Sequence, residues 1–84
     1  MSKANISGRR IKQIREKLGW QQIDLAAALN VDFKIKLEQS DISEIERGAR
    51  ALKDYELDAI ARVLNVSPVW LLRGNGEPDG YPKR

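Results

Sequence analysis

The chain has 84 residues, of which 42% are hydrophobic and 32% charged, the balance of one small globular domain. It contains no cysteine and no histidine, so a disulfide framework, a thiolate nucleophile, a histidine base and a zinc finger are excluded. Its longest apolar run, residues 25–29, is too short for a signal peptide core or a membrane span, and we expect a cytoplasmic protein.

The net charge of +3 is unevenly distributed along the chain. Residues 1–17 carry six basic side chains against one acidic side chain, which favours a polyanionic partner such as DNA. Residues 32–46 carry five acidic side chains against two basic ones, which opposes such a partner. The position of each charge therefore matters more than the total.

Residues 1–7 are expected to form an N-terminal arm that ends with Ser7 as the cap of a first helix. Gly19 is placed to end this helix. A second helix is expected from Gln22 to about Asn30. Apolar residues recur at helical spacing in both helices and predict their buried faces: Ile11, Ile14, Leu18, Ile23, Leu25, Ala26 and Leu29.

The segment from Val31 to Glu38 alternates strictly between apolar and polar residues. Period two favours an extended segment, expected here over residues 34–37. However, Phe33 continues the i, i+4, i+8 series of Leu25 and Leu29, which would prolong the second helix instead. Both interpretations stay open, and so does a third in which this segment binds a partner. Its apolar residues are expected to cover the core of their own domain: Val31, Phe33, Ile35 and Leu37.

Three more helices follow. The third is expected from Gln39 to Arg47, with Gly48 as its stop. Asp54 is expected to cap the fourth helix, and Ser67 to cap a fifth that runs over residues 68–73. The fourth helix carries a stripe for the core, and residues 75–84 are rich in glycine and proline and predict a flexible tail. The stripe consists of Leu57, Ile60, Ala61 and Leu64.

The order and spacing of these residues resemble the phage repressor and Cro-type helix-turn-helix family, also called the XRE family. The likeness extends over residues 8–74, with the motif itself at 22–48. It is carried by Ile14-Arg15, Leu18-Gly19, Gln22-x-x-Leu25-Ala26, Ile42-Ser43-x-Ile45-Glu46-x-Gly48 and Leu57-x-x-Ile60-Ala61-x-x-Leu64-x-Val66-Ser67-x-x-Trp70-Leu71. The resemblance implies an all-α, lambda-repressor-like domain of five short helices. The connection between Leu29 and Gln39 is longer than the family's usual turn, and we therefore expect a lengthened turn inside the motif.

In this family the second helix of the motif enters the major groove and the first helix braces against the DNA backbone. The resemblance therefore implies that base edges are contacted by Gln39, Ser40, Ser43 and Glu44. Glutamine suits adenine, serine suits several bases, and glutamate accepts a hydrogen bond from cytosine. Phosphate contacts are implied for Gln22 at the start of the second helix, with Arg10, Arg47 and Arg50 as further candidates. On composition alone these side chains would form an ordinary solvated surface.

The resemblance also implies a structural ion pair between Arg15 and Glu46, which would tie the first helix to the third. Trp70 and Leu71 are open to two interpretations, a dimer surface or core packing.

The expected function is sequence-specific binding of double-stranded DNA by a transcriptional regulator, as a homodimeric repressor of the bacterial, phage or mobile-element type. The alternative is a protein-interaction module on the same fold, such as an antitoxin-like or adaptor domain. No catalytic motif is present, so we expect no enzymatic activity. No cofactor, metal or membrane partner is expected.

Overall fold

The computed structural model describes residues 5–74, and its regular structure consists of five helices, which confirms the predicted all-α fold. None of these helices is long and apolar enough to cross a membrane. Their bounds are α1 Gly8–Lys17, α2 Gln22–Phe33, α3 Gln39–Glu46, α4 Asp54–Leu64 and α5 Pro68–Arg73.

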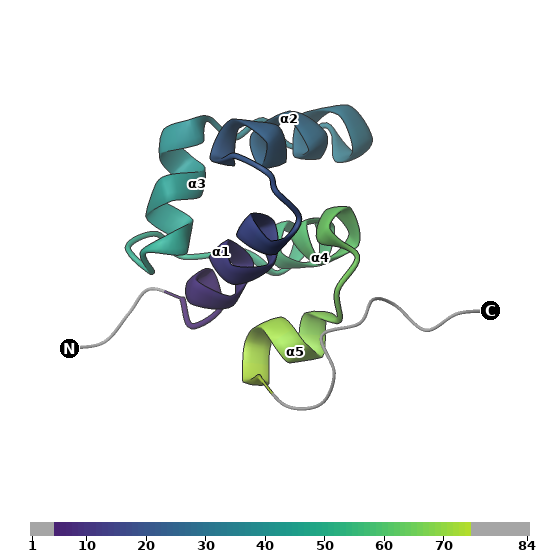
Figure 1. The fold of residues 1–84 in the computed structure, drawn as a ribbon. Coiled ribbons are helices and arrows are strands. Elements are labelled where there is room, and N and C mark those ends of the chain that lie inside the picture. The colour runs from purple at the N-terminus through teal and green to yellow at the C-terminus, as the bar shows by residue number, and fades with distance from the viewer. Residues whose placement is uncertain (1–4, 75–84) are drawn as a thin grey trace.

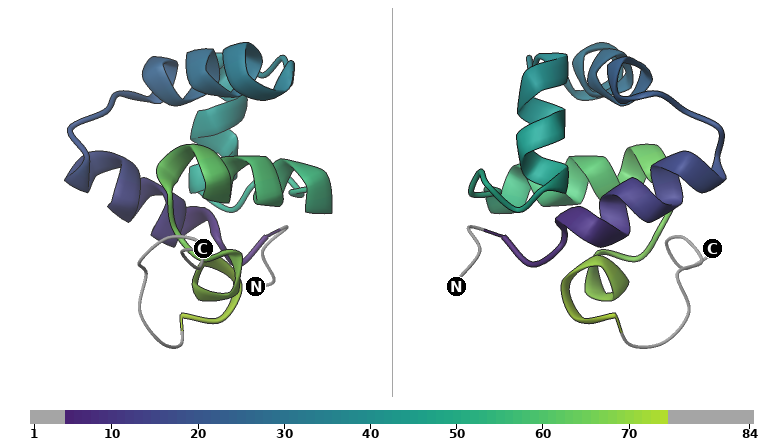
Figure 2. Two further views of the ribbon diagram at one scale, coloured as in Figure 1. Left: turned by 90° about the vertical axis from the view of Figure 1, so that its right-hand side faces the viewer. Right: turned by 60° about the vertical axis from the view of Figure 1, so that its left-hand side comes forward.

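The helices are stacked in three levels (Figure 1). α2 lies at one end of the molecule, α1 and α4 form the middle level, and α5 lies at the other end. α3 runs along one side and joins the level of α2 to that of α1 and α4, an arrangement that persists in both rotated views (Figure 2). One surface of α3 is thereby left open to solvent.

A single core lies between the helices and includes the predicted stripe of α4. Two predicted core positions are wrong: Leu18 is 47% exposed and Ile23 is 59% exposed. Leu18 comes just after the last turn of α1, where the chain turns at Gly19, which has a φ of 79°. The buried hydrophobic residues are Ile11, Ile14, Leu25, Ala26, Leu29, Ile42, Ile45, Leu57, Ala59, Ile60, Ala61, Leu64, Val66, Trp70 and Leu71. Trp70 and Leu71 are therefore core residues.

The start of α1 is organised by Asn5 rather than by the predicted cap, Ser7. The Ser7 side chain makes no capping hydrogen bond. Instead, Asn5 Oδ1 accepts hydrogen bonds from the backbone N–H groups of Ser7 (3.1 Å) and Gly8 (2.7 Å). Asn5 Nδ2 donates to the carbonyls of Ile45 (3.0 Å) and Arg50 (2.8 Å). The last residues of the expected arm thus contact the domain, while residues 1–4 and the expected tail 75–84 lie outside the described residues.

The lengthened connection combines both interpretations of its sequence. α2 continues through Phe33, and Lys34 ends it in the left-handed conformation with a φ of 57°. Residues 34–38 are neither helix nor strand. The expectation that all four apolar residues here cover the core is wrong for two of them: Val31 is 77% exposed and Phe33 is 38% exposed. They occupy the solvent side of the last turn of α2, whereas Ile35 and Leu37 pack against the core.

The remaining helix ends differ little from prediction. α3 ends at Glu46, one residue early, and the chain turns at Gly48, which has a φ of 75°. Asp54 is the first residue of α4 and not its cap, because Lys53 holds the extended capping conformation. The Glu56 carboxylate accepts the Lys53 N–H at 3.0 Å. Ser67 caps α5 as predicted, since its Oγ accepts from the N–H groups of Val69 and Trp70.

Candidate nucleic-acid interface

The outer surface of α3 is polar and accessible. Gln39, Ser40 and Glu44 are exposed and Ser43 is half-buried, while Ile42, Ile45 and Glu46 face inward. This division follows from helical geometry, because residues three and four apart share a face. The structure therefore brings all four residues predicted to contact bases onto one face: Gln39, Ser40, Ser43 and Glu44.

The inner surface of α3 is held by the predicted ion pair. Arg15 Nε donates to Glu46 Oε2 at 2.6 Å, and its Nη2 lies 3.1 Å from Glu46 Oε1. The two side chains are 8% and 1% exposed, so both charges are removed from water. Arg15 Nη1 also donates to the Trp20 carbonyl at 2.6 Å. The hydrogen bonds that Arg15 donates to Glu46 raise the pKa of the Arg15 guanidinium above its ordinary value.

A chain of hydrogen bonds connects this ion pair to the exposed face of α3. Gln22 Nε2 donates to Glu46 Oε1 at 3.0 Å, and Gln39 Nε2 donates to Gln22 Oε1 at 3.2 Å. The first residues of α2 and α3 are therefore joined directly through their side chains. Sequence reasoning assigned Gln22 only to a phosphate and missed this connection, because it joins residues 17 and 24 positions apart.

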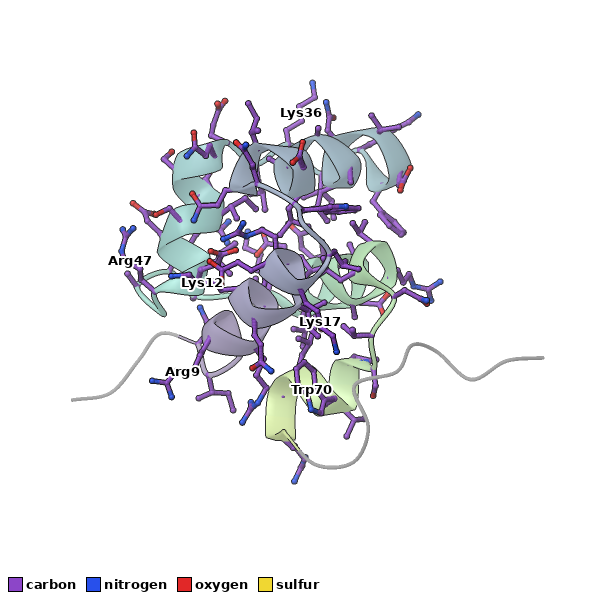
Figure 3. The ribbon with its side chains drawn as sticks, in the orientation of Figure 1. Arg9, Lys12, Lys17, Lys36, Arg47 and Trp70 are labelled. Carbon is purple, nitrogen blue, oxygen red and sulfur yellow. The ribbon has the colours of Figure 1, made fainter. Side chains whose placement is uncertain are left out.

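At the other end of α3, Ser43 and Arg47 are paired. Arg47 Nη1 donates to Ser43 Oγ across one helical turn. Arg47 is exposed, and Figure 3 shows it projecting from the lower end of α3.

The other two predicted phosphate contacts have structural partners instead. Arg50 forms a bidentate ion pair with Glu56, with both N–O distances at 3.0 Å. This hydrogen bonding raises the pKa of Arg50 and lowers that of Glu56. Arg10 Nη1 donates to the Leu71 carbonyl at 3.0 Å, which attaches it to α5, at the far end of the molecule from α2. The structure thus does not bring Arg10 to the start of α2.

Two hollows flank the N-terminal ends of α2 and α3. One, of about 560 Å³, is lined by residues that include Trp20, Gln22, Ile23 and Gln39. The other, of about 500 Å³, lies between α2 and the connection, and Ile23 and Gln39 line it as well. Ile23 and Gln39 therefore line both hollows. The helical spacing of apolar residues predicted that Ile23 is buried. The one sequence feature that sets Ile23 apart from the buried residues of α2 is its place in the first turn of the helix.

The acidic side chains near α3 are mostly occupied. Glu46 is paired with Arg15, and Asp41 Oδ2 accepts the Glu38 N–H at 2.8 Å. A carboxylate in the first turn of a helix also offsets the helix dipole. Glu44 remains as an exposed carboxylate on the outer face of α3.

Two helices packed at their N-terminal ends, the second with a polar outer face and an inner face fastened to α1, define the helix-turn-helix class. The chain belongs to the helix-turn-helix family, whose sequence model matches residues 11–71, and it is of the XRE or Cro-repressor type.

Among solved structures, the chain is similar to the P22 c2 repressor protein, crystallised in complex with the synthetic operator 9T in the presence of Tl⁺. The two are 28% identical, with a TM-score of 0.71, and the match covers 84% of this chain and 98% of the repressor chain. A comparison with curated protein sequences found no match. The lambda-repressor-like fold predicted from the sequence is confirmed.

Proposed function

We propose that this protein regulates transcription by sequence-specific binding of double-stranded DNA, with α3 in the major groove. One observation carries the proposal: Gln39 is exposed on the outer face of α3, and its side chain is oriented by a hydrogen bond to Gln22. A side chain held in place before binding loses less conformational entropy when it bonds a base. The operator complex of the similar P22 c2 repressor supports the same reading.

The proposed base contacts are those of the outer face of α3. Gln39 offers an amide that can bond adenine in bidentate fashion, and Ser40 can donate to or accept from several bases. Glu44 can accept a hydrogen bond from cytosine N4. Ser43 lies between these residues and its hydroxyl is already engaged by Arg47, so its contribution is to hold Arg47.

The proposed phosphate contacts are Gln22 and Arg47. The first turn of α2 presents backbone N–H groups and the positive end of the helix dipole, which favour an anion. Arg47 is a cation at the opposite end of α3 from Gln39. Arg10 and Arg50 are not retained, because the first is bonded to α5 and the second to Glu56.

We further propose that the protein acts as a homodimeric repressor on a palindromic operator. Two copies of one recognition helix read a palindrome when their half-sites lie about one helical turn apart, roughly 34–36 Å. The length of a footprint and the stoichiometry on the selected operator test this directly. A footprint of one half-site with one protein bound would contradict the dimer.

Selection of bound duplexes from a random pool tests the function, and Gln39→Ala tests the assigned face. The parent should enrich one sequence, and Gln39→Ala should lose about 1–3 kcal/mol on it, with relaxed selectivity at one base pair. Gln13→Ala, which removes another exposed glutamine from α1, is the matched control and should bind like the parent. Failure of the parent to enrich any sequence would reject DNA recognition and favour a protein-interaction module on the same fold.

A further inference from the structure

Residues 34–38 form a segment with two faces, which comes from the alternation in its sequence. Ile35 and Leu37 pack against the core, and the Ile35 N–H donates to the Leu29 carbonyl at 3.2 Å. The intervening polar residues, Lys34, Lys36 and Glu38, are exposed. Because alternate residues of an extended chain point in opposite directions, Ile35 and Leu37 hold Lys36, which lies between them, outward.

Lys36 lines the hollow of about 500 Å³ that this segment forms with α2. Small side chains, Ala26 and Ala27, form part of its other wall. Gln39 lines the same hollow, so Lys36 and the proposed adenine-reading residue share one depression of the surface. Lys34, two residues earlier, does not line it.

Lys36 has no ion-pair partner among residues 5–74. The other charged side chain lining this hollow is Glu38, which leaves the hollow with no net charge. The ammonium group of Lys36 is therefore available to bind one anionic group of a partner.

Lys36 and Arg47 lie toward opposite ends of α3. Figure 3 shows Lys36 at the level of α2 and Arg47 at the lower end of α3. Lys36 precedes the first residue of α3 and Arg47 follows its last residue, so the two cations lie next to opposite ends of the face that is proposed to read bases.

We propose that Lys36 contacts a DNA phosphate, and that the lengthened connection of this chain serves to place it there. This inference rests on the proposed function. Lys36 then contributes equally to the affinity for every DNA sequence, whereas Gln39 contacts a base and contributes to sequence selectivity.

The test compares Lys36→Gln with Lys34→Gln, a matched pair of exposed lysines on one segment. Binding to the selected operator and to an unrelated duplex is measured between about 50 and 200 mM salt. For Lys36→Gln, the slope of log K against log salt should decrease in magnitude by about 0.9, with a loss of affinity of roughly fivefold near physiological salt. The loss should be equal on both duplexes. Lys34→Gln should behave like the parent, and thermal unfolding should show both variants as stable as the parent.

Each contrary outcome has its own meaning. If the parent enriches no sequence, the proposed function fails before the variants are compared. If the parent binds and Lys36→Gln keeps the parent's salt slope, the phosphate contact is overturned while the proposed function stands. If Lys36→Gln weakens only the operator, Lys36 reads a base, and the phosphate assignment is equally overturned.

Discussion

Arg15 is a buried charged residue that is held by hydrogen bonds to other parts of the chain. Its guanidinium bonds both oxygens of Glu46 and the carbonyl of Trp20, with almost no access to water. Replacing such a pair by apolar residues can be neutral, but removing one partner leaves the other charge buried without compensation. A substitution of either residue is therefore expected to destabilise the protein unless the other residue is replaced as well.

Arg15→Ala should lower the free energy of unfolding by about 3–5 kcal/mol, because it leaves the Glu46 carboxylate buried and unpaired. Denaturant unfolding measures the loss. Arg62→Ala is the control, since Arg62 and Asp58 form a pair whose side chains are 55% and 51% exposed. That change should cost no more than about 0.5 kcal/mol. Equal midpoints for Arg15→Ala and the parent would contradict a stabilising pair.

Gln22 shows how one residue can serve both stability and recognition. Its amide donates to the buried Glu46 and accepts from the exposed Gln39. The ion pair in the core and the outer face of α3 are consequently joined by one hydrogen-bonded network. A variant at Gln22 would alter both properties, which is why Gln39 is the better residue for testing recognition.

At the scale of elements, the junction of α3 and α4 depends on the pair of Arg50 and Glu56. Glu56 is buried and also accepts the Lys53 N–H, so the same carboxylate begins α4 and holds the connection before it. The hydrogen bonds from Arg50, and next the one from Lys53, keep the pKa of Glu56 below its ordinary value.

This lowered pKa predicts a loss of stability in acid. The folded state binds the Glu56 proton less readily than the unfolded state does. The stabilisation is therefore complete above the ordinary glutamate pKa of about 4.3 and is lost as pH falls through the lower folded pKa. Glu56→Gln should lower the free energy of unfolding by about 1.5–3 kcal/mol at neutral pH. The stability of this variant should also fall less steeply than that of the parent as the pH is lowered.

Denaturant unfolding at a series of pH values from about 7 to 3 checks this linkage. Asp32→Asn is the control, because Asp32 is exposed on α2 and has no ion pair within residues 5–74. It should retain the parent's dependence on pH. If the stability of Glu56→Gln falls with pH as steeply as that of the parent, other carboxylates are responsible for the loss of stability in acid.

The connection between α2 and α3 shows what the local sequence pattern could predict and what it could not. The i, i+4, i+8 series correctly extended α2 to Phe33, and period two correctly indicated a non-helical segment afterwards. Neither pattern showed that Val31 and Phe33 face solvent, because that depends on which side of α2 the other helices occupy.

At the scale of the whole molecule, Asn5 joins the start of the chain to its middle. Its side chain accepts from the first N–H groups of α1 and donates to two carbonyls, one at the end of α3 and one in the loop before α4. Next to it, Gly8 allows α1 and α3 to approach closely, since a Cβ there would lie 2.1 Å from the Ile45 carbonyl oxygen. Asn5 and Ser7, which precede α1, are therefore part of the folded domain.

Asn5→Ala should destabilise the protein by about 1–3 kcal/mol, because the carbonyls of Ile45 and Arg50 lose a partly buried donor. Asn5→Asp keeps the acceptor for Gly8 but places carboxylate oxygen against both carbonyls, and it should cost at least as much. Thermal unfolding measures both variants, with Asn30→Ala on the exposed side of α2 as control. A melting temperature that Asn5→Ala leaves unchanged would assign these contacts no stabilising role.

The sequence by itself determined the five helices, the ends set by Gly19 and Gly48, the core stripe of α4 and the polar outer face of α3. All of these depend on local backbone preference and on helical period, which act within a few residues. It also allowed the pair of Arg15 and Glu46 to be expected through family resemblance.

Only the tertiary structure showed which basic side chains have partners within the domain. Arg10 and Arg50 were expected to meet phosphates, but they are bonded to Leu71 and Glu56. Asn5 replaced Ser7 at the start of α1, and Gln22 joined the core pair to Gln39. These contacts bring together side chains from different elements, and no periodicity within one element records which distant partner lies opposite a given residue.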